Sequence, residues 1–148
     1  MKIYLGSDHA GYELKEKLKI FLGEKGYEMK DFGAFSLNPE DDYPDFVRSV
    51  AEAVAADPES RGVVFGGSGQ GEAIICNRSK GVRAAVYYGG NQEIVKLSRE
   101  HNDANVLSFG ARFVSEEEAK EALTLWLATP FEGGRHQRRV EKIDNKIV

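Results

Sequence analysis

A glycine-rich stretch that ends in an acid is the first feature of this sequence that could do chemistry. Residues 63–74 read VVFGGSGQGEAI, an apolar run, a cluster of glycines and then Glu72. The order of strand, bend and helix predicts backbone N–H groups that face a cleft and favour negative charge. The stretch matches neither the G-x-G-x-x-G dinucleotide fingerprint nor a P-loop, since no Lys-Ser/Thr pair ends it. A tight turn without a ligand is the other interpretation.

Glu72 is the side chain of this stretch that could take a proton. An acid in the first turn of a helix often serves only to complement the helix dipole at the surface. Beside a site for an oxyanion, however, a carboxylate can act as the base that forms an enediolate. The pKa of such a base must rise from about 4.3 by desolvation, which the loop N–H groups and the helix dipole oppose. Burial must therefore dominate if Glu72 is a base.

Further polar residues follow the predicted strands. They are Asp8 and His9 after the first strand, His101 and Asn102 near the end of the fourth helix, and Arg112 after the last strand. We expect all of them at one rim of the sheet, because ligands of parallel α/β sheets bind at the carboxyl ends of the strands. Each histidine could instead be a structural side chain.

Two arginines near the end of the chain form a candidate anion site. Arg135 and Arg139 are four residues apart, so on a helix they project from one face and could bind one dianion together. A solvated basic face is the alternative for this pair.

Length and composition limit the class of protein. The 148 residues, of which 41% are hydrophobic and 30% charged, fit one soluble domain spanning 1–148. The net charge of −4 argues against nucleic-acid binding. No apolar run reaches the roughly 18 residues of a membrane span, and no signal-peptide pattern follows Met1, so we expect a cytoplasmic protein without membrane contact. The single cysteine, Cys76, excludes an internal disulfide and predicts a buried, unreactive thiol.

Strand-like and helical segments alternate along the whole chain. Strands are predicted at 2–7, 27–32, 62–67, 81–88 and 104–110, and helices at 11–24, 44–56, 90–101, 115–128 and 135–147, with a further helix after the glycine loop. This alternation predicts an α/β fold with a parallel five-stranded sheet, helices on both faces and a C-terminal helix. The irregular segment 33–42 is long enough to be a functional loop.

Five motifs in order resemble the ribose-5-phosphate isomerase B family, whose relatives include the galactose-6-phosphate isomerase subunits and allose-6-phosphate isomerase. The motifs are SDHAG (7–11), DYPD (42–45), GGSGQGE (66–72), SREHNDANVL (98–107) and TPFEGGRHQRRV (129–140). The resemblance implies a Rossmann-like domain that interconverts aldose and ketose phosphates through an enediolate, without cofactor or metal. It also implies a homodimer with shared active sites, with a tetramer as a further option.

The resemblance assigns roles to individual residues. It implies that His101 opens the sugar ring as an acid, and that Arg112 joins the site from the partner subunit. Arg135 and Arg139, with His9, would hold the phosphate. The expected substrate-binding residues are Asp8, His9, Tyr43, Gly67, Gly69, Gln70, Gly71, Asn102, Arg112, Arg135 and Arg139.

One departure from the family pattern bears on the base. Many members carry a cysteine where this chain has Ser68, and that thiolate takes the proton. A serine hydroxyl without a base partner cannot do so. Another group of the family has this serine and a glutamate four residues later, which Glu72 matches. We therefore expect Glu72 as the base, Ser68 as an assistant at most, and no role for Cys76.

The preferred reaction is the interconversion of ribose 5-phosphate and ribulose 5-phosphate. A six-carbon substrate such as allose 6-phosphate or galactose 6-phosphate is the nearest alternative, because pocket length depends on the surroundings of Tyr43 and on loop 33–42. A non-catalytic sugar-phosphate-binding protein is the alternative of another class, although binding alone needs neither Glu72 nor His101. A flavodoxin-like or nucleotide-binding module is a further alternative, but the chain lacks the acid that would hold a ribose.

Overall fold

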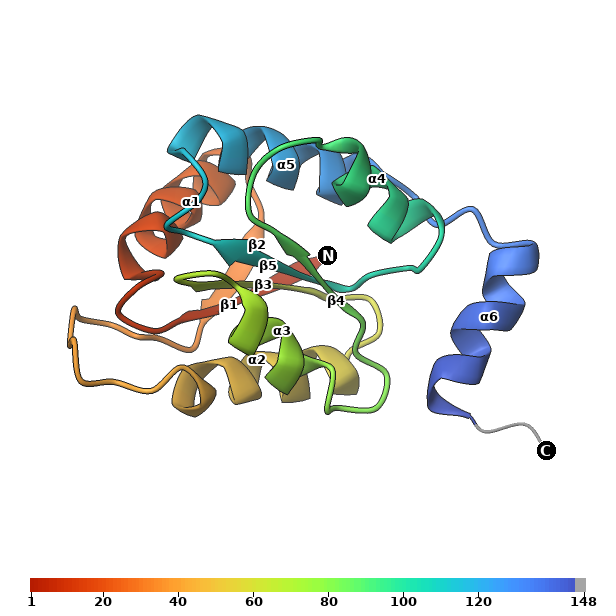
Figure 1. Ribbon diagram of the computed structural model, residues 1–148, viewed down its shortest axis with the longest axis horizontal. Helices are drawn as coiled ribbons and strands as arrows, with labels where there is room; N and C mark the ends of the chain where they lie inside the picture. The colour runs from red at the N-terminus through yellow and green to blue at the C-terminus, as the bar shows by residue number, and fades with distance from the viewer. Residues whose placement is uncertain (146–148) are drawn as a thin grey trace.

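Five parallel strands alternate with helices along the chain, as the sequence predicts (Figure 1). The computed structural model describes residues 1–145. The strands are β1 (Lys2–Ser7), β2 (Glu28–Asp31), β3 (Arg61–Gly66), β4 (Ala84–Tyr87) and β5 (Val106–Gly110). The helices are α1 (Tyr12–Glu24), α2 (Pro44–Ala56), α3 (Gln70–Cys76), α4 (Glu93–Glu100), α5 (Glu116–Ala128) and α6 (Arg135–Asp144). Ends differ from the prediction by up to three residues, and the last predicted helical residues, 146 and 147, lie outside the described residues.

The sheet has the strand order β2-β1-β3-β5-β4, and every neighbouring pair is parallel. All five residues of β5 are buried, as the apolar runs predict for strands covered on both faces. At the edge, β2 exposes Glu28 and Lys30, in keeping with the alternation of polar and apolar residues along 27–32. In the middle of the sheet Gly66 pairs with Gly110, so the carboxyl ends of β3 and β5 lie side by side.

Helices cover both faces of the sheet (Figure 1). On one face α1, α4 and α5 enclose a core that includes Leu18, Phe109 and Trp126, all fully buried. On the other face α2 and α3 pack through a second core that includes Val50 and Cys76. The expected buried thiol is confirmed, and burial raises the pKa of Cys76 to about 12. This cysteine is therefore protonated and unreactive near neutrality.

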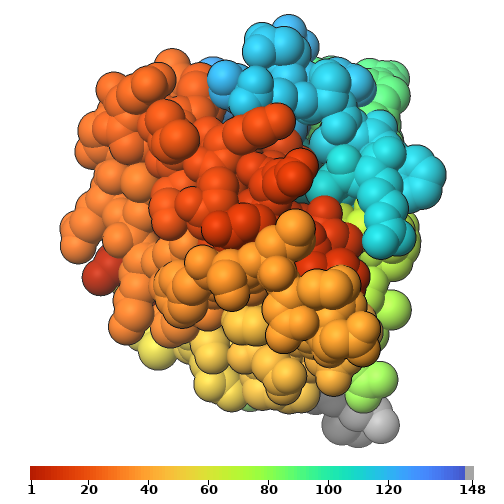
Figure 2. Space-filling model, turned by 90° about the vertical axis from the view of Figure 1, so that its left-hand side faces the viewer, coloured from red at the N-terminus to blue at the C-terminus, as the bar shows by residue number. Residues whose placement is uncertain are grey.

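The direction of the helices determines which segments lie at the carboxyl ends of the strands and which lie at their amino ends. A helix that connects parallel strands returns antiparallel to them, so it ends beside the amino end of the next strand. In Figure 1 the strands end on the left, whereas α4 ends on the right, where α6 stands beyond the sheet. Figure 2 shows the left end: the segment after β1 (red), loop 33–43 (orange) and the segment after β5 (cyan) lie together there.

Candidate active site

The glycine loop between β3 and α3 is held against the end of β5. The N–H groups of Ala111 and Arg112 donate to the carbonyls of Gly66 and Gly67, at 2.7 and 3.1 Å. Gly69 has a left-handed backbone with φ of +79°, and a Cβ there would lie 3.0 Å from the backbone of Phe109. Within residues 1–145 the N–H groups of Ser68 and Gly69 have no hydrogen-bond partner. The loop therefore presents free donors at the end of the sheet.

Glu72 lies in the first turn of α3 and is 4% exposed. Its carboxylate packs against Gly66 so closely that a Cβ at position 66 would overlap it. Burial raises the pKa of Glu72, and the negative charge of Asp8 adds to the rise, whereas the backbone N–H of Glu72 lowers it. Burial outweighs the opposing hydrogen bond, which is the condition that a glutamate base must meet.

Asp8 and His9 lie at the same end of the sheet, directly after β1. One carboxylate oxygen of Asp8 accepts from the N–H groups of Ala10 and Gly11, at 3.0 and 3.2 Å, so this acid also fixes the turn that leads into α1. His9 contacts Asp41 from loop 33–42, with Nδ1 at 2.7 Å from Oδ1. That contact and the charge of Asp8 raise the pKa of His9, against desolvation and the charge of Arg112.

Tyr43 and Arg112 border the glycine loop from two sides. A Cβ at Gly71 would lie 2.6 Å from the Tyr43 ring, and a Cβ at Gly67 would lie 3.1 Å from the Arg112 guanidinium. Arg112 therefore reaches the loop of its own chain, whereas the sequence-based expectation places it in the site of a partner subunit. A hollow of about 220 Å³ at this loop is lined by Ser68, Gln70, Tyr88 and Phe113.

His101 and Asn102 do not lie at this end of the sheet, contrary to the expectation of one shared rim. They follow the last turn of α4, which runs back from the end of β4 to the start of β5. The backbone carbonyl of Asn102 accepts from the Nε of Arg83, just before β4, at 3.1 Å. The prediction failed because it treated the end of a helix like the end of a strand.

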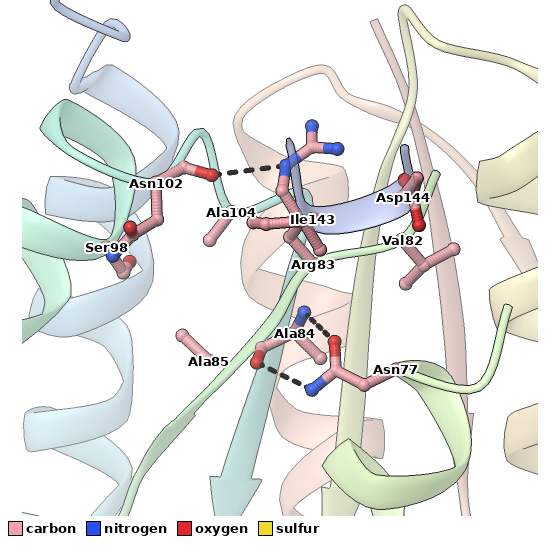
Figure 3. A pocket seen from close by; sticks show the side chains of 10 residues that line it. All are labelled: Asn77, Val82, Arg83, Ala84, Ala85, Ser98, Asn102, Ala104, Ile143 and Asp144. Carbon is pink, nitrogen blue, oxygen red and sulfur yellow. Dashed lines mark hydrogen bonds between the residues drawn. The ribbon is translucent and has the colours of Figure 1, made fainter. Parts of the chain in front are cut away.

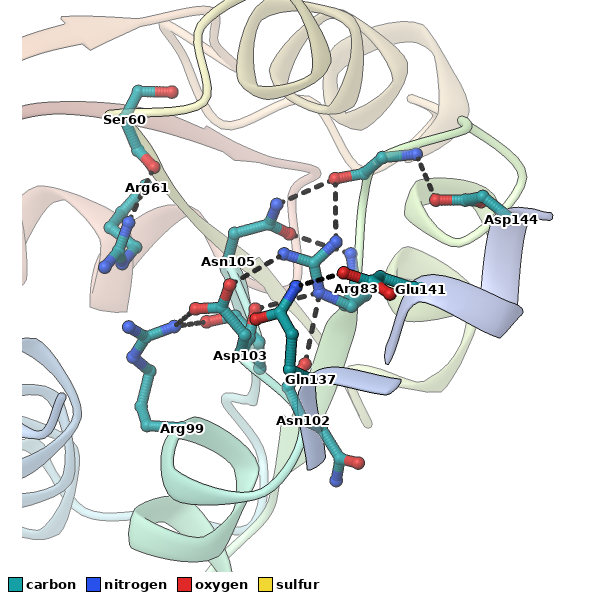
Figure 4. Close-up of polar contacts among 12 residues, drawn as sticks. Ser60, Arg61, Arg83, Arg99, Asn102, Asp103, Asn105, Gln137, Glu141 and Asp144 are labelled. Carbon is teal, nitrogen blue, oxygen red and sulfur yellow. Dashed lines mark hydrogen bonds and ion pairs between the residues drawn. The ribbon is translucent and has the colours of Figure 1, made fainter. Parts of the chain in front are cut away.

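Two arginines fix the segment that carries His101 and Asn102 (Figure 4). Arg83 also donates to the Asp103 carbonyl at 3.0 Å, and Arg99 forms an ion pair with the Asp103 carboxylate at 2.8 Å. Asp103 has a φ of +48°, so the turn needs these contacts to hold a non-glycine residue in the left-handed region. A cavity of about 350 Å³ adjoins Arg83 and Asn102, between β4 and the end of α6 (Figure 3).

Arg135 and Arg139 also belong to this second end. Both are exposed on α6, whose Asp144 accepts from the N–H of Gly81 just before β4, at 2.9 Å. Between the arginines, buried His136 stacks on His101 with ring centroids 4.2 Å apart and planes 12° apart. The structure thus brings His101 together with the arginine pair, but not with Glu72.

The predicted site is therefore divided between two ends of the chain. Residues at the strand ends are Asp8, His9, Tyr43, Gly67, Ser68, Gly69, Gln70, Gly71, Glu72 and Arg112. Residues at the other end are His101, Asn102, Arg135 and Arg139. The two ends are separated by at least the length of β5. This strand has five residues, and at about 3.3 Å per residue it is about 16 Å long.

Among residues 1–145, two groups of side chains lie close enough to bring three metal-ligand atoms together: His101 with Glu132 and His136, and Asp8 with His9 and Asp41. In the first group the two imidazole rings stack face to face, so their lone pairs run parallel and do not converge on one ion. In the second the Nδ1 of His9 is already engaged by Asp41. We assign a metal to neither group.

Asp41 and His136 are polar residues of the two ends that the sequence reasoning did not single out. Asp41 could have been found from the sequence, because it lies in the long irregular segment 33–42, two residues before the candidate Tyr43. His136 lies between the two predicted phosphate-binding arginines in the chain.

A parallel α/β fold with a buried acid beside free backbone donors at the strand ends defines a class of proton-transfer enzymes. Comparison with known proteins narrows this class: the chain belongs to the Ribose/Galactose Isomerase family, whose model it matches over residues 3–143. Within the residues described, no helix is long and apolar enough to cross a membrane.

The similarity to individual relatives extends along nearly the whole chain. Ribose-5-phosphate isomerase B of Escherichia coli is 43% identical, over 96% of this chain and 93% of its own. The ribose-5-phosphate isomerase B structure from Clostridium thermocellum has a TM-score of 0.92 and 47% identity, and covers 97% of this chain and 95% of its own. The enzyme from Mycoplasma genitalium, solved with bound ribulose-5-phosphate, has a TM-score of 0.92 and 37% identity, covering 96% and 93%.

Proposed function

We propose that this chain is an aldose–ketose isomerase that interconverts ribose 5-phosphate and ribulose 5-phosphate without a cofactor. The observation that carries the proposal is the buried Glu72, with its raised pKa, next to the unpartnered N–H groups of Ser68 and Gly69. A sugar-phosphate-binding protein has no need to desolvate a carboxylate in this way. The named relatives, including the enzyme with bound ribulose-5-phosphate, support the same reaction.

The reaction uses the two features in succession. The Glu72 carboxylate removes the proton from the carbon next to the carbonyl, and the electron pair moves to the carbonyl oxygen to give an enediolate. The loop N–H groups stabilise the negative oxygen, which is where charge develops in the transition state. Protonated Glu72 then returns its proton to the neighbouring carbon, while a proton moves between the two oxygens. Ser68, exposed beside them, can assist that last transfer.

A complete site requires a second copy of the chain. His101, the proposed ring-opening acid, and the Arg135–Arg139 pair lie about one strand length or more from Glu72, which is too far for one sugar phosphate. A symmetric dimer solves this, because two copies related by a twofold axis can place the helix end of one against the strand ends of the other, twice. We therefore propose a homodimer with shared sites, in which the partner supplies His101, Asn102, Arg135 and Arg139, and not Arg112.

The chain falls in the subgroup with serine and glutamate in place of the catalytic cysteine. Ser68 is exposed on the loop, and Glu72 is buried beside it. Cys76 is buried at the end of α3, and burial raises its pKa to about 12. The glutamate is thus the group of the three that can exchange a proton near neutrality. A cytoplasmic location remains a prediction.

The test is an isomerisation assay on purified protein with a panel of five- and six-carbon sugar phosphates, with and without a chelator. We expect the highest kcat/KM with ribose 5-phosphate and no loss with chelator. A higher kcat/KM with allose 6-phosphate or galactose 6-phosphate would move the assignment to the six-carbon alternative. Tight binding without turnover on every member of the panel would favour the binding protein.

A further inference from the structure

A contact between His9 and Asp41 has no part in the mechanism above. The same oxygen, Oδ1 of Asp41, accepts from the backbone N–H of His9 at 2.9 Å and lies 2.7 Å from its ring Nδ1. An ionised carboxylate can only accept, so the ring must donate from Nδ1. The Asp41 side chain is 8% exposed and the His9 side chain 30% exposed. The other ring nitrogen, Nε2, is left for a ligand.

The loop that carries Asp41 is fixed before any ligand arrives. At its start, the fully buried ammonium of Lys15 donates to the carbonyl of Ala34 at 2.8 Å. The backbone of Ser7 exchanges two hydrogen bonds of 2.7 Å with Gly33 and Ala34. Near its end, the N–H of Asp41 donates to the carbonyl of Asn38 at 3.1 Å. The start of the loop is thus anchored to the body of the protein, and a turn within the loop, together with the contacts to His9, orients Asp41.

Charges on three segments face His9. Asp41 on the loop and Asp8 at the end of β1 favour a proton on the ring, and Arg112 after β5 disfavours it. Asp41 is the largest of these influences, and the pKa of His9 is raised as a result. The second oxygen of Asp41, Oδ2, is buried and has no partner within residues 1–145, so this carboxylate depends on His9 for charge compensation.

We propose that Asp41 is a positioning residue for the phosphate of the substrate, acting through His9. It holds the ring with Nδ1–H toward itself and keeps the second proton on Nε2, so that His9 meets a phosphate oxygen as an imidazolium donor. A neutral ring with its proton on Nδ1 would offer the phosphate a lone pair, which an acceptor-only dianion repels. Asp41 therefore decides over which pH range His9 assists binding. The role in binding depends on the proposed function, but the protonation of His9 is a property of the free protein.

The first experiment follows the His9 ring in the free protein by ¹⁵N NMR titration, with His9→Gln to assign the signal. Asp41→Asn keeps the shape of the side chain and removes its charge, and Asp42→Asn, at the exposed neighbouring residue, is the matched control. We expect Asp41→Asn to lower the pKa of His9 by about one unit or more, and Asp42→Asn to leave it unchanged. An unshifted His9 in Asp41→Asn overturns the proposal, whether or not the protein isomerises any sugar. Asp41→Ser is the second variant if Asp41→Asn does not fold.

The second experiment measures KM for ribose 5-phosphate between pH 6 and pH 9. If Asp41→Asn lowers the pKa of His9 by one unit, the protonated fraction above both pKa values falls about tenfold. KM should therefore rise up to about tenfold over wild type on the alkaline side, and the difference should narrow toward pH 6, with little change in kcat. In a His9→Gln background the Asp41→Asn change should add nothing. A KM that rises equally at every pH would show a structural effect and overturn the proposed role in binding.

Discussion

At the scale of single residues, the proposed chemistry depends on the burial of one carboxylate. Glu72 is buried against Gly66, and a side chain at position 66 would displace the carboxylate from its place. The same burial that raises its pKa makes its charged form costly in the folded protein. Catalytic use and stability therefore oppose each other at this position.

The substitution Glu72→Gln tests the base directly. The amide keeps the shape but cannot accept a proton, so kcat should fall by about 10²–10⁴-fold while KM changes little. Ser68→Ala should cost less, and Cys76→Ala should leave kcat nearly unchanged. A Glu72→Gln enzyme that keeps more than about a tenth of the wild-type kcat would contradict the assignment.

Thermal unfolding provides the control for this variant. Because the pKa of Glu72 is higher in the folded protein than in the unfolded chain, its stabilising effect is present at low pH and is lost as pH rises through the folded pKa. At pH 7.5 the neutral glutamine avoids that loss. The Tm of Glu72→Gln should be equal to or above that of wild type, which separates lost catalysis from lost folding.

The pH dependence of wild-type activity also follows from the raised pKa of Glu72. A base must be deprotonated, so kcat/KM should fall on the acid side as Glu72 takes up a proton, with an apparent pKa above the ordinary glutamate value of about 4.3. The acid limb should be absent from the residual activity of Glu72→Gln. A limb that persists in this variant at the same pH would assign it to another group.

At the scale of elements, α6 stands apart from the sheet and presents its basic residues to solvent. Arg135 and Arg139 lie four residues apart on it, and His136 between them is buried against His101. The helix thus uses its inward side chain for docking and leaves the exposed Arg135 and Arg139 without a partner among residues 1–145, open to a ligand. Such groups bind a phosphate dianion with several oriented N–H donors.

Removing one of these donors should affect binding of the phosphate and little else. Arg139→Ala should raise KM for ribose 5-phosphate by about tenfold or more, since a hydrogen bond to a charged group contributes about 1.5–3 kcal/mol. Its Tm should stay near that of wild type, because the residue is exposed. Arg138→Ala is the matched control, since it removes an equal charge about 100° away around the helix. Steady-state kinetics on both variants would refute the role if KM of Arg139→Ala stayed within about twofold of wild type.

At the scale of the whole molecule, the proposed reaction requires the two ends to meet across an interface between two copies of the chain. Within a single chain, Glu72 and His101 lie at opposite ends of the sheet. A variant that lacks Glu72 still carries His101, and a variant that lacks His101 still carries Glu72. In a homodimer with shared sites, two inactive variants can therefore complement each other.

Mixing Glu72→Gln with His101→Asn tests this arrangement. A mixed dimer has one site with both native residues and one with neither. Random assembly of equal amounts makes half of the dimers mixed, so activity should recover to about a quarter of wild type. The measurement is ribose 5-phosphate turnover after co-expression, with each variant expressed alone as the control. Recovery no greater than the sum of the two variants would contradict shared sites.

The sequence by itself determined the elements and singled out the candidate reacting groups. Apolar runs mark four of the strands, because strands buried on both faces carry few charges, and alternating polar and apolar residues mark the exposed edge strand β2. Ser115 followed by Glu118 is a capping-box pattern, and it opens α5. The glycine loop and Glu72 could be recognised because a close backbone approach and an acid in a first helical turn have local signatures. The motifs from residue 7 to residue 140 indicated the family, which the comparison confirms.

Only the tertiary structure decided which of these groups lie together. Whether a side chain lies at the carboxyl or the amino end of the sheet depends on the direction of the helix that carries it, and this placed His101 away from Glu72 and Arg112 beside its own glycine loop. Burial likewise depends on packing by elements distant in the chain, so the raised pKa of Glu72 could be required from the sequence but not established. The contact of Asp41 with His9 spans 32 residues and carries no local pattern, because Lys15 and β1 anchor the start of loop 33–42.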